Sequence, residues 1–195
     1  MKHIQKEKIG KYIIKIYNDT DPIDPRGNDN LGTMVCFHTR YSLGDKHNYN
    51  HKDYKDWEQM KKAIIRNENA GVILPLYLYD HSGITMNTTG FSCRWDSGQV
   101  GWIYISKQKM LEEYGGKYVT KKLKERVVEY LVNEVEEYDQ YLTGEAYGYK
   151  IFEKGENGKE EIDSCWGYYE QEYCLSEARG VVAYYVENNK EKIDV

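Results

Sequence analysis

Residues 70–106, AGVILPLYLYDHSGITMNTTGFSCRWDSGQVGWIYIS, decide the fold of this chain. The stretch begins with an apolar run at 72–79 and ends with another at 100–105, and both runs are rich in β-branched and aromatic residues. Such runs are typical of buried β-strands. Pro75 interrupts the first run, which indicates an edge strand or a β-bulge. The polar connection between the runs carries most of the chemically capable side chains, so we expect a rigid sheet that presents a functional loop.

Further strands and helices are predicted on both sides of this stretch. Apolar residues at helical spacing predict helices over residues 53–66, 106–114, 120–141 and 173–188. Alternating or short apolar runs predict strands over residues 11–17, 33–39, 84–86, 145–154 and 160–169, the last two joined by a hairpin turn at GENGK. Strands and helices do not alternate regularly. We therefore predict an α+β fold, in which a mostly antiparallel sheet is covered on one side by two or three helices.

The length and composition indicate one globular domain, residues 1–195. The chain is 40% hydrophobic and 30% charged, with only 3 prolines, which is typical of a folded protein. No segment approaches the roughly 20 apolar residues of a membrane span, and the start, MKHIQKEKIGKY, has no apolar signal-peptide core. The 4 cysteines form no CxxC pair, which favours free thiols in a reducing cytoplasm.

The charge of the chain is divided unevenly along its length. Residues 1–124 contain 20 Lys and Arg against 14 Asp and Glu, whereas residues 125–195 contain 7 against 18, so the net charges are +6 and −11. We therefore distinguish a basic half, 1–124, from an acidic half, 125–195. Asymmetry of this kind indicates interaction surfaces, because an acidic surface repels nucleic acid and attracts basic protein clefts.

We expect no metal site and no cofactor. His47 and His51 are four residues apart, but the asparagines around them disfavour a helix and no HExxH partner is present. The aspartates of the loop 18–30 do not have the spacing of a calcium-binding loop. A turn-rich polar loop explains them better.

One group of residues is suited to catalysis. Cys93 is a candidate nucleophile, with His81 as the base and Asp96 as the group that orients it, and His38 and Asp80 are the alternatives for these two roles. The chain contains no G-x-S-x-G, P-loop or G-x-G-x-x-G motif. A small Cys/His hydrolase or nucleic-acid-processing enzyme is therefore an alternative function, and a turn at residues 80–83 explains the same residues without chemistry.

Nucleic-acid binding by the basic half is a second alternative. Its candidate contacts are Lys52, Lys55, Lys61, Lys62, Arg66, Lys107, Lys109, Lys117, Lys121, Lys122 and Lys124. Acidic residues are interspersed among them, so a solvated surface explains most of these side chains, and we expect at most a weak contact with nucleic acid.

The function we favour is binding of a protein through an acidic, tyrosine-rich face. Carboxylates along a helix can imitate a row of phosphates and occupy the Arg and Lys clefts that hold DNA, while tyrosines supply contact area. The charges of the predicted helix 120–141 oppose its macrodipole, being basic first and acidic last. The predicted partner-binding residues are Glu134, Glu136, Glu137, Tyr138, Asp139, Tyr141, Glu145 and Tyr147.

Four strings of this sequence resemble a family of small proteins carried by phages, prophages and plasmids of Gram-positive bacteria. They are DPRGNDNLGTMVCFHTRYSLGD (24–45), LPLYLYDHSGITMNTTGFSCRWDSGQVGWIYIS (74–106), EVEEYDQYLTGEAYGY (134–149) and DSCWGYY (163–169). The family looks similar to anti-CRISPR proteins, the inhibitors of the RNA-guided nuclease Cas9. The resemblance implies a counter-defence protein in the host bacterial cytoplasm. It would inhibit by stoichiometric binding to the nuclease, alone or with its guide RNA or DNA, and the resemblance implies no catalytic residues.

Overall fold

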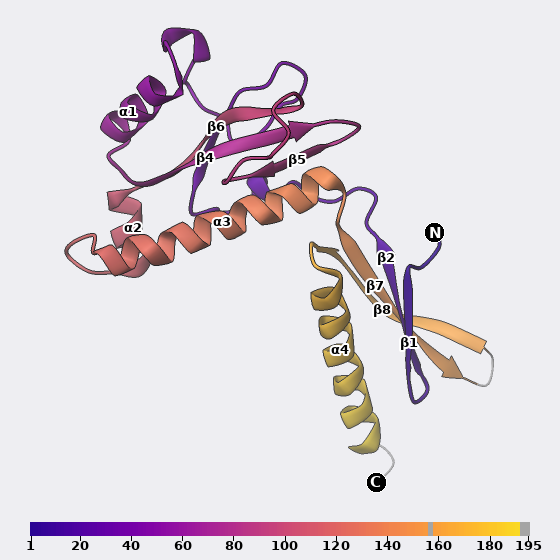
Figure 1. The fold of residues 1–195 in the computed structure, drawn as a ribbon. Coiled ribbons are helices and arrows are strands. Elements are labelled where there is room, and N and C mark those ends of the chain that lie inside the picture. The colour runs from indigo at the N-terminus through magenta and orange to yellow at the C-terminus, as the bar shows by residue number, and fades with distance from the viewer. Residues whose placement is uncertain (156–157, 192–195) are drawn as a thin grey trace. The chain divides into compact units, whose positions relative to one another are not determined.

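The structure is a computed structural model that describes residues 1–155 and 158–191. These residues form four α-helices and eight β-strands in two antiparallel sheets, which confirms the α+β class (Figure 1). The sequence predicted a single domain, but the chain divides into two compact units. We call Met1–Ile23 with Gly144–Val195 the terminal unit, and Asp24–Thr143 the central unit. The division arises because the two ends of the chain complete one sheet, while the middle of the chain builds another sheet with its own core.

The terminal unit is a four-stranded antiparallel sheet with one helix. Its strands, in the order β1-β2-β7-β8, are β1 (Gln5–Ile9), β2 (Tyr12–Asn18), β7 (Tyr147–Gly155) and β8 (Gly158–Tyr168). The sequence did not predict β1. Two residues of the predicted GENGK turn, 156–157, lie outside the described residues. Helix α4 (Gln171–Glu191) packs its Leu175, Ala178 and Val182 against Ile14 and Ile151 of the sheet (Figure 1).

The central unit is built on the stretch that the sequence singled out. Its strands, in the order β3-β6-β4-β5, are β3 (Thr33–Cys36), β6 (Ser97–Ser106), β4 (Ala70–Asp80) and β5 (Ile84–Asn87). Strand β5 pairs only with the end of β4, from Tyr77 onward. Pro75 therefore lies on a part of β4 that β5 does not reach, where its missing N–H breaks no ladder with β5, as the edge-strand prediction requires.

Helices cover both faces of the central sheet, rather than one. Helices α2 (Lys107–Tyr114) and α3 (Lys121–Thr143) bury Met110 and Leu131 against one face, whereas α1 (Trp57–Asn67) packs Ile64 against Trp102 on the other (Figure 1). The short 3-10 turns η1 (Pro25–Gly27) and η2 (His51–Asp53) lie in the loops before and after β3. The predicted N-cap serine of α2, Ser106, accepts a hydrogen bond from the backbone N–H of Lys109.

The basic and acidic halves of the sequence do not correspond to the two folded units. The central unit contains 16 Lys and Arg against 17 Asp and Glu, and the terminal unit contains 11 against 15, so their net charges are −1 and −4. The difference is small because the lysine-rich hairpin β1–β2 folds with the acidic C-terminal segment. The charge division that suggested an acidic binding half is therefore largely removed by folding.

Candidate functional site

Glu134, the first residue of the predicted acidic face, points into the central unit instead of toward a partner. Its side chain is 7% exposed. Its carboxylate accepts hydrogen bonds from the backbone N–H groups of Leu31 (2.5 Å) and Gly32 (3.1 and 3.2 Å). The residue lies on the same face of α3 as the buried Leu131 and Tyr138, so the helix turns it toward the core. The structure therefore gives the Glu134 carboxylate an internal role, whereas the predicted partner contact requires an exposed side chain.

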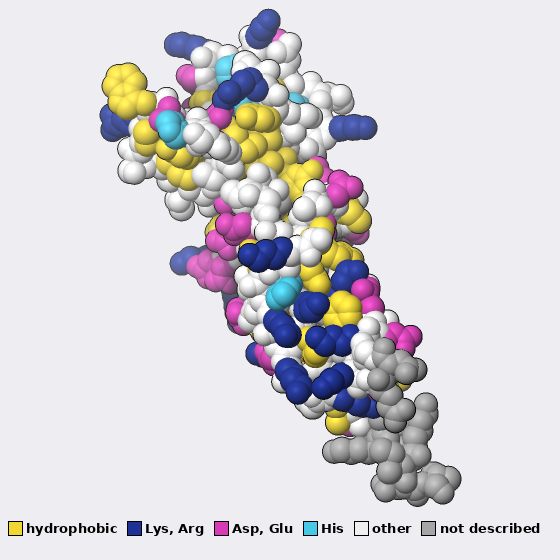
Figure 2. Space-filling view, turned by 90° about the vertical axis from the view of Figure 1, so that its right-hand side faces the viewer, with side chains coloured by type: hydrophobic (Ala, Val, Ile, Leu, Met, Phe, Trp, Pro, Cys, Tyr) yellow, Lys and Arg dark blue, Asp and Glu magenta, His cyan; other side chains and the backbone are white. Residues whose placement is uncertain are grey.

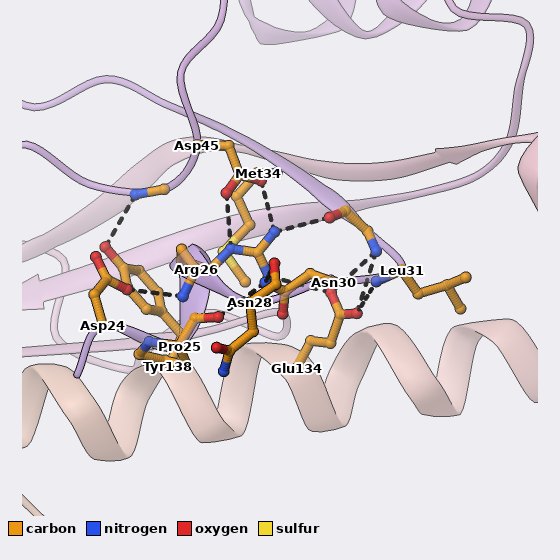
Figure 3. A network of polar contacts seen from close by, with 12 residues as sticks. Asp24, Pro25, Arg26, Asn28, Asn30, Leu31, Met34, Asp45, Glu134 and Tyr138 are labelled. Atoms are coloured by element: carbon orange, nitrogen blue, oxygen red, sulfur yellow. Dashed lines mark hydrogen bonds and ion pairs between the residues drawn. The ribbon is translucent and has the colours of Figure 1, made fainter. Parts of the chain in front are cut away.

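A buried arginine connects Glu134 to the sheet (Figure 3). Arg26, whose side chain is 4% exposed, donates from Nη1 to Glu134 at 3.2 Å. It also donates two parallel bonds to Asp45, at 3.0 and 2.6 Å, and one to the carbonyl of Gly32 at 2.8 Å. Burial opposes the arginine's charge, but the two carboxylates outweigh it and raise the pKa of Arg26. The network therefore attaches the loop before β3 to helix α3, which is a structural role.

Two further predicted contact residues on α3 are also turned inward. Tyr138 is buried, its hydroxyl oxygen accepts from the backbone N–H of Gly44 at 3.0 Å, and burial raises the pKa of Tyr138 to about 12. Asp139 accepts from the backbone N–H of Met86 (2.6 Å) and from the Thr85 hydroxyl (3.0 Å), and so holds strand β5 against α3. Neither side chain is available to a partner in this fold.

The rest of the predicted face is divided between the two units. Glu136 and Glu137 are exposed on α3, and Tyr141 is half-buried there. Partial desolvation of its carboxyl group by the surrounding protein, followed by repulsion from Glu134, raises the pKa of Glu137. Glu145 and Tyr147 belong to the terminal unit, the first exposed and the second half-buried. The structure therefore retains no row of four helix carboxylates that could imitate a line of phosphates.

The structure brings together all three residues of the predicted enzymatic alternative. Asp96 lies between the other two, with its Oδ2 atom 3.4 Å from His81 Nδ1 and 3.7 Å from Cys93 Sγ. They meet because β4 ends at Asp80 and β6 begins at Ser97, and the backbone N–H of Asp80 donates to the carbonyl of Asp96 at 2.8 Å. The loop that the sequence predicted to be functional is thus closed at its base by the sheet itself.

The order of contacts differs from that of an activated cysteine. In a catalytic Cys-His-Asp arrangement the imidazole lies between the thiol and the carboxylate, because it must remove the thiol proton. Here the carboxylate contacts both other groups, and it presents a negative charge to the sulfur atom. Asp96 can orient His81, but the Cys93 thiol contacts the carboxylate of Asp96 instead of the imidazole that would have to remove its proton.

A second polar cluster surrounds Asp80, beside the first. His38 Nε2 lies 3.5 Å from Asp80 Oδ2, and Arg40 donates to the same carboxylate oxygen. The backbone N–H groups of Arg40 and Tyr41 donate to His38 Nδ1, which places the proton of a neutral His38 on Nε2, toward Asp80. The sequence named His38 and Asp80 as alternatives, but Arg40 gave no signal, because it enters from a loop forty residues away.

The most exposed large hydrophobic side chain of the described residues is Trp95, at this end of the sheet, which is 95% exposed. Its loop is held by the Cys93–Asp96 contact and by a hydrogen bond from the Ser97 hydroxyl to the carbonyl of Cys93. A shallow pocket of about 280 Å³ lies beside it, and His38, Asp80 and Asp96 are among its lining residues. An indole held in water by a tied loop is a large apolar area that a partner can cover.

Within the described residues, no group of three or more His, Cys, Asp or Glu side chains has the arrangement of a metal site. His47 bonds to the carbonyl of Cys36 through Nε2 at 3.1 Å, and the rings of both His47 and His51 contact the Phe37 ring in an edge-to-face arrangement. The basic residues proposed for nucleic-acid binding are scattered over η2, α1, α2, α3 and the loops beside them, and some are engaged internally. Lys109 donates to the carbonyl of Asn30 at 2.6 Å, and Lys61 lies over the Trp102 ring.

Comparison of the chain with protein-family models, with curated proteins and with solved structures finds no significant match. Of the helices formed by the described residues, none has both the length and the apolar character that a membrane crossing requires.

Proposed function

We propose that this chain is a non-enzymatic counter-defence protein of a mobile element, which inhibits a Cas9-type nuclease, with or without its guide RNA or DNA, by stoichiometric binding. The resemblance of its four strings to counter-defence proteins supports the class. The loops of the central unit, rather than the acidic side of α3, form the proposed contact. The observation that carries this choice is Trp95, which is 95% exposed on a tied loop and lines a shallow pocket with His38 and Asp80. These two residues in turn contact the exposed Tyr41 ring and the Arg40 guanidinium.

These residue types support a protein partner. Trp, Tyr and Arg are the residues that most often dominate the binding energy of protein interfaces. A pinned loop also loses little conformational entropy when it binds, so more of the burial energy of the indole appears as affinity. The polar groups around Asp80 already have partners within the chain, so binding does not leave them unsatisfied.

The test is titration of a Cas9-type nuclease–guide complex with the purified protein. We expect DNA cleavage to stop at a fixed molar ratio, and Trp95→Ala to weaken binding at least about 30-fold, as for an interface hot spot. The matched control is Tyr118→Ala, because Tyr118 is also a strongly exposed aromatic residue, at 79%, but lies between α2 and α3. Absence of a complex with the nuclease would reject the proposal. Equal effects of the two substitutions would reject the Trp95 surface.

A small hydrolase is the second candidate, because Asp96 contacts both His81 and Cys93. An enzyme would inactivate its target at far below one equivalent and leave a covalently changed product. Cys93→Ser would abolish that activity, and Trp95→Ala would leave the bond-breaking step itself intact. Mass spectrometry of the nuclease, guide and target DNA after incubation separates this candidate from stoichiometric binding.

A further inference from the structure

The sheet of the terminal unit has one covered face and one face with a strong positive charge. Helix α4 packs on the side of the sheet that carries Ile14, Ile16 and Ile151. The alternate positions of the strands point to the other side, which we call the open sheet face. Among the described residues, its charged members are six lysines and one carboxylate, namely Lys6, Lys8, Lys15, Lys150, Lys154, Lys159 and Glu161. Figure 2 shows lysine and arginine side chains gathered over these strands in the lower part of the view.

The pleat of the sheet separates the two signs of charge. The carboxylates of the same strands lie mainly on the side of α4, where Glu7 accepts two bonds from Arg179 of that helix and Asp163 accepts one from the Tyr185 hydroxyl. Period-two alternation thus turns a mixed sequence such as KEK into one basic and one acidic side. The net charge of the terminal unit, which is −4, therefore gives no indication of this basic face.

Three of these lysines form a row across the sheet. Lys6 lies directly opposite Lys15, and Lys15 lies directly opposite Lys150, on three adjacent strands. Like charges in directly opposed positions destabilise a sheet. Two contacts within the chain relieve part of this repulsion: Lys150 pairs with Glu161 at 2.9 Å, and Lys15 lies over the Phe152 ring. An anionic ligand over the row would remove the repulsion.

An aromatic row runs beside the lysine row. Tyr17, Gly148 and Trp166 are opposed on neighbouring strands, and the rings of Tyr17 and Trp166 are 6.1 Å apart. The indole of Trp166 lies over Gly148, where a Cβ atom would come within 2.2 Å of the ring. Trp166 remains 37% exposed. The open sheet face therefore presents the partly exposed Trp166 indole, whose ring is tilted by 39° against that of the buried Tyr17, next to a line of positive charge.

We propose that the open sheet face binds single-stranded nucleic acid, with phosphates on the row Lys6–Lys15–Lys150 and a base stacked on Trp166. A line of positive charge beside an exposed aromatic ring suits a single strand, whose phosphates and bases are both accessible, whereas an acidic protein surface would need the lysines but not the indole. A duplex keeps its bases stacked inside and would also use only the lysines. The inference does not depend on nuclease inhibition, and it assigns the nucleic-acid contact to the terminal unit instead of the lysines of the central unit.

The experiment measures fluorescence anisotropy of labelled DNA and RNA oligonucleotides, single-stranded and duplex, with the full-length protein over a range of salt concentrations. Replacing Lys6, Lys15 and Lys150 by Ala should lower single-strand affinity about 50-fold at 0.15 M salt and reduce the slope of log K against log salt by about 2, the value for three lost phosphate contacts. Trp166→Ala should weaken binding without changing that slope. Glu161→Gln should strengthen binding, because it removes the carboxylate that competes for Lys150.

Two matched controls define the outcomes. The triple change of Lys52, Lys55 and Lys62 to Ala alters the same charge on exposed positions of the central unit, and Glu160→Gln alters the neighbouring residue of β8, on the side of α4. Small effects of both controls support the proposal. It is overturned if single strands do not bind at low salt, if duplex DNA or polyglutamate binds as tightly and independently of Trp166, or if the control lysines matter as much. No nuclease is present, so failure here leaves the proposed inhibition to its own test.

Discussion

Replacing Glu134 by Ala should destabilise the central unit strongly, although Glu134 lies among carboxylates that resemble a binding surface in the sequence. The change removes the acceptor of the Leu31 and Gly32 N–H groups and one of the two carboxylates that compensate Arg26. Unsatisfied buried groups cost about 1–3 kcal/mol each, and breaking a buried ion pair from one side costs about 3–5 kcal/mol.

Because these losses share one network they are not additive, and we expect a total loss of about 3–5 kcal/mol in the free energy of unfolding. Glu134→Gln should have an intermediate effect, since the amide keeps one acceptor oxygen but loses the charge. Glu136→Ala is the matched control, because Glu136 is exposed two residues away on the same helix, and surface changes usually stay within about 0.5 kcal/mol.

Urea denaturation followed by tryptophan fluorescence is a suitable assay, because three of the four tryptophans belong to the central unit. The slope of the transition must remain unchanged for the midpoint shift to be interpreted as stability. The reasoning is refuted if Glu134→Ala and Glu136→Ala have equal stability and only the former loses affinity for the nuclease. That result would restore Glu134 to the partner surface on which the sequence placed it.

Four other perturbations test the structure. Gly148→Ala should destabilise the terminal unit by about 1–3 kcal/mol, because the new Cβ would meet the Trp166 ring at 2.2 Å. Gly180→Ala, on the open side of α4, should stabilise the same unit by about 0.5–1 kcal/mol; urea denaturation measures both. Alkylation at pH 8 with mass spectrometry should modify Cys93 and Cys165 well before Cys36 and Cys174, since burial raises the pKa of each of the latter two thiols to about 12. Glu137→Gln should raise the melting temperature slightly at pH 7 and not at pH 3. The pKa of Glu137 is higher in the folded than in the unfolded protein, so the stability linked to its protonation is present below the unfolded-state pKa and is lost as the pH rises through the folded-state pKa. At pH 7 the folded protein therefore carries an unfavourable charge, which the neutral glutamine removes.

Local patterns predicted most elements of this fold, because caps and periodicity act over a few residues. The N-cap Ser106 and the apolar runs of β4 and β6 are examples. The pairing of β2 with β7 could not be inferred, since no local pattern specifies a partner strand almost 130 residues away. The single-domain expectation and the division into charged halves were both drawn without this pairing, which joins the two ends of the chain in one sheet.

The features of the candidate sites differ in how far the sequence alone could have predicted them. Glu134 falls on the apolar stripe of α3, one turn from Leu131 and Tyr138, and that spacing already indicated an inward position. The shared loop allowed His81, Cys93 and Asp96 to meet but did not require it, and the central position of Asp96 depends on side-chain geometry. The lysine row arises from registers between distant strands, so only the alternation within β1 gave any local sign of it.

The interrupted sequence of the terminal unit has a consequence for synthesis on the ribosome. The hairpin β1–β2 is translated before the central unit, but β7 follows only after the whole central unit, which takes on the order of ten seconds at about 5–20 residues per second. An isolated two-stranded hairpin is marginally stable at best. The nascent hairpin must therefore wait, with its apolar side uncovered, while the continuous central segment can fold. A chain truncated after Thr143 should therefore contain a folded central unit, whereas its hairpin β1–β2 would lack the partner strand β7.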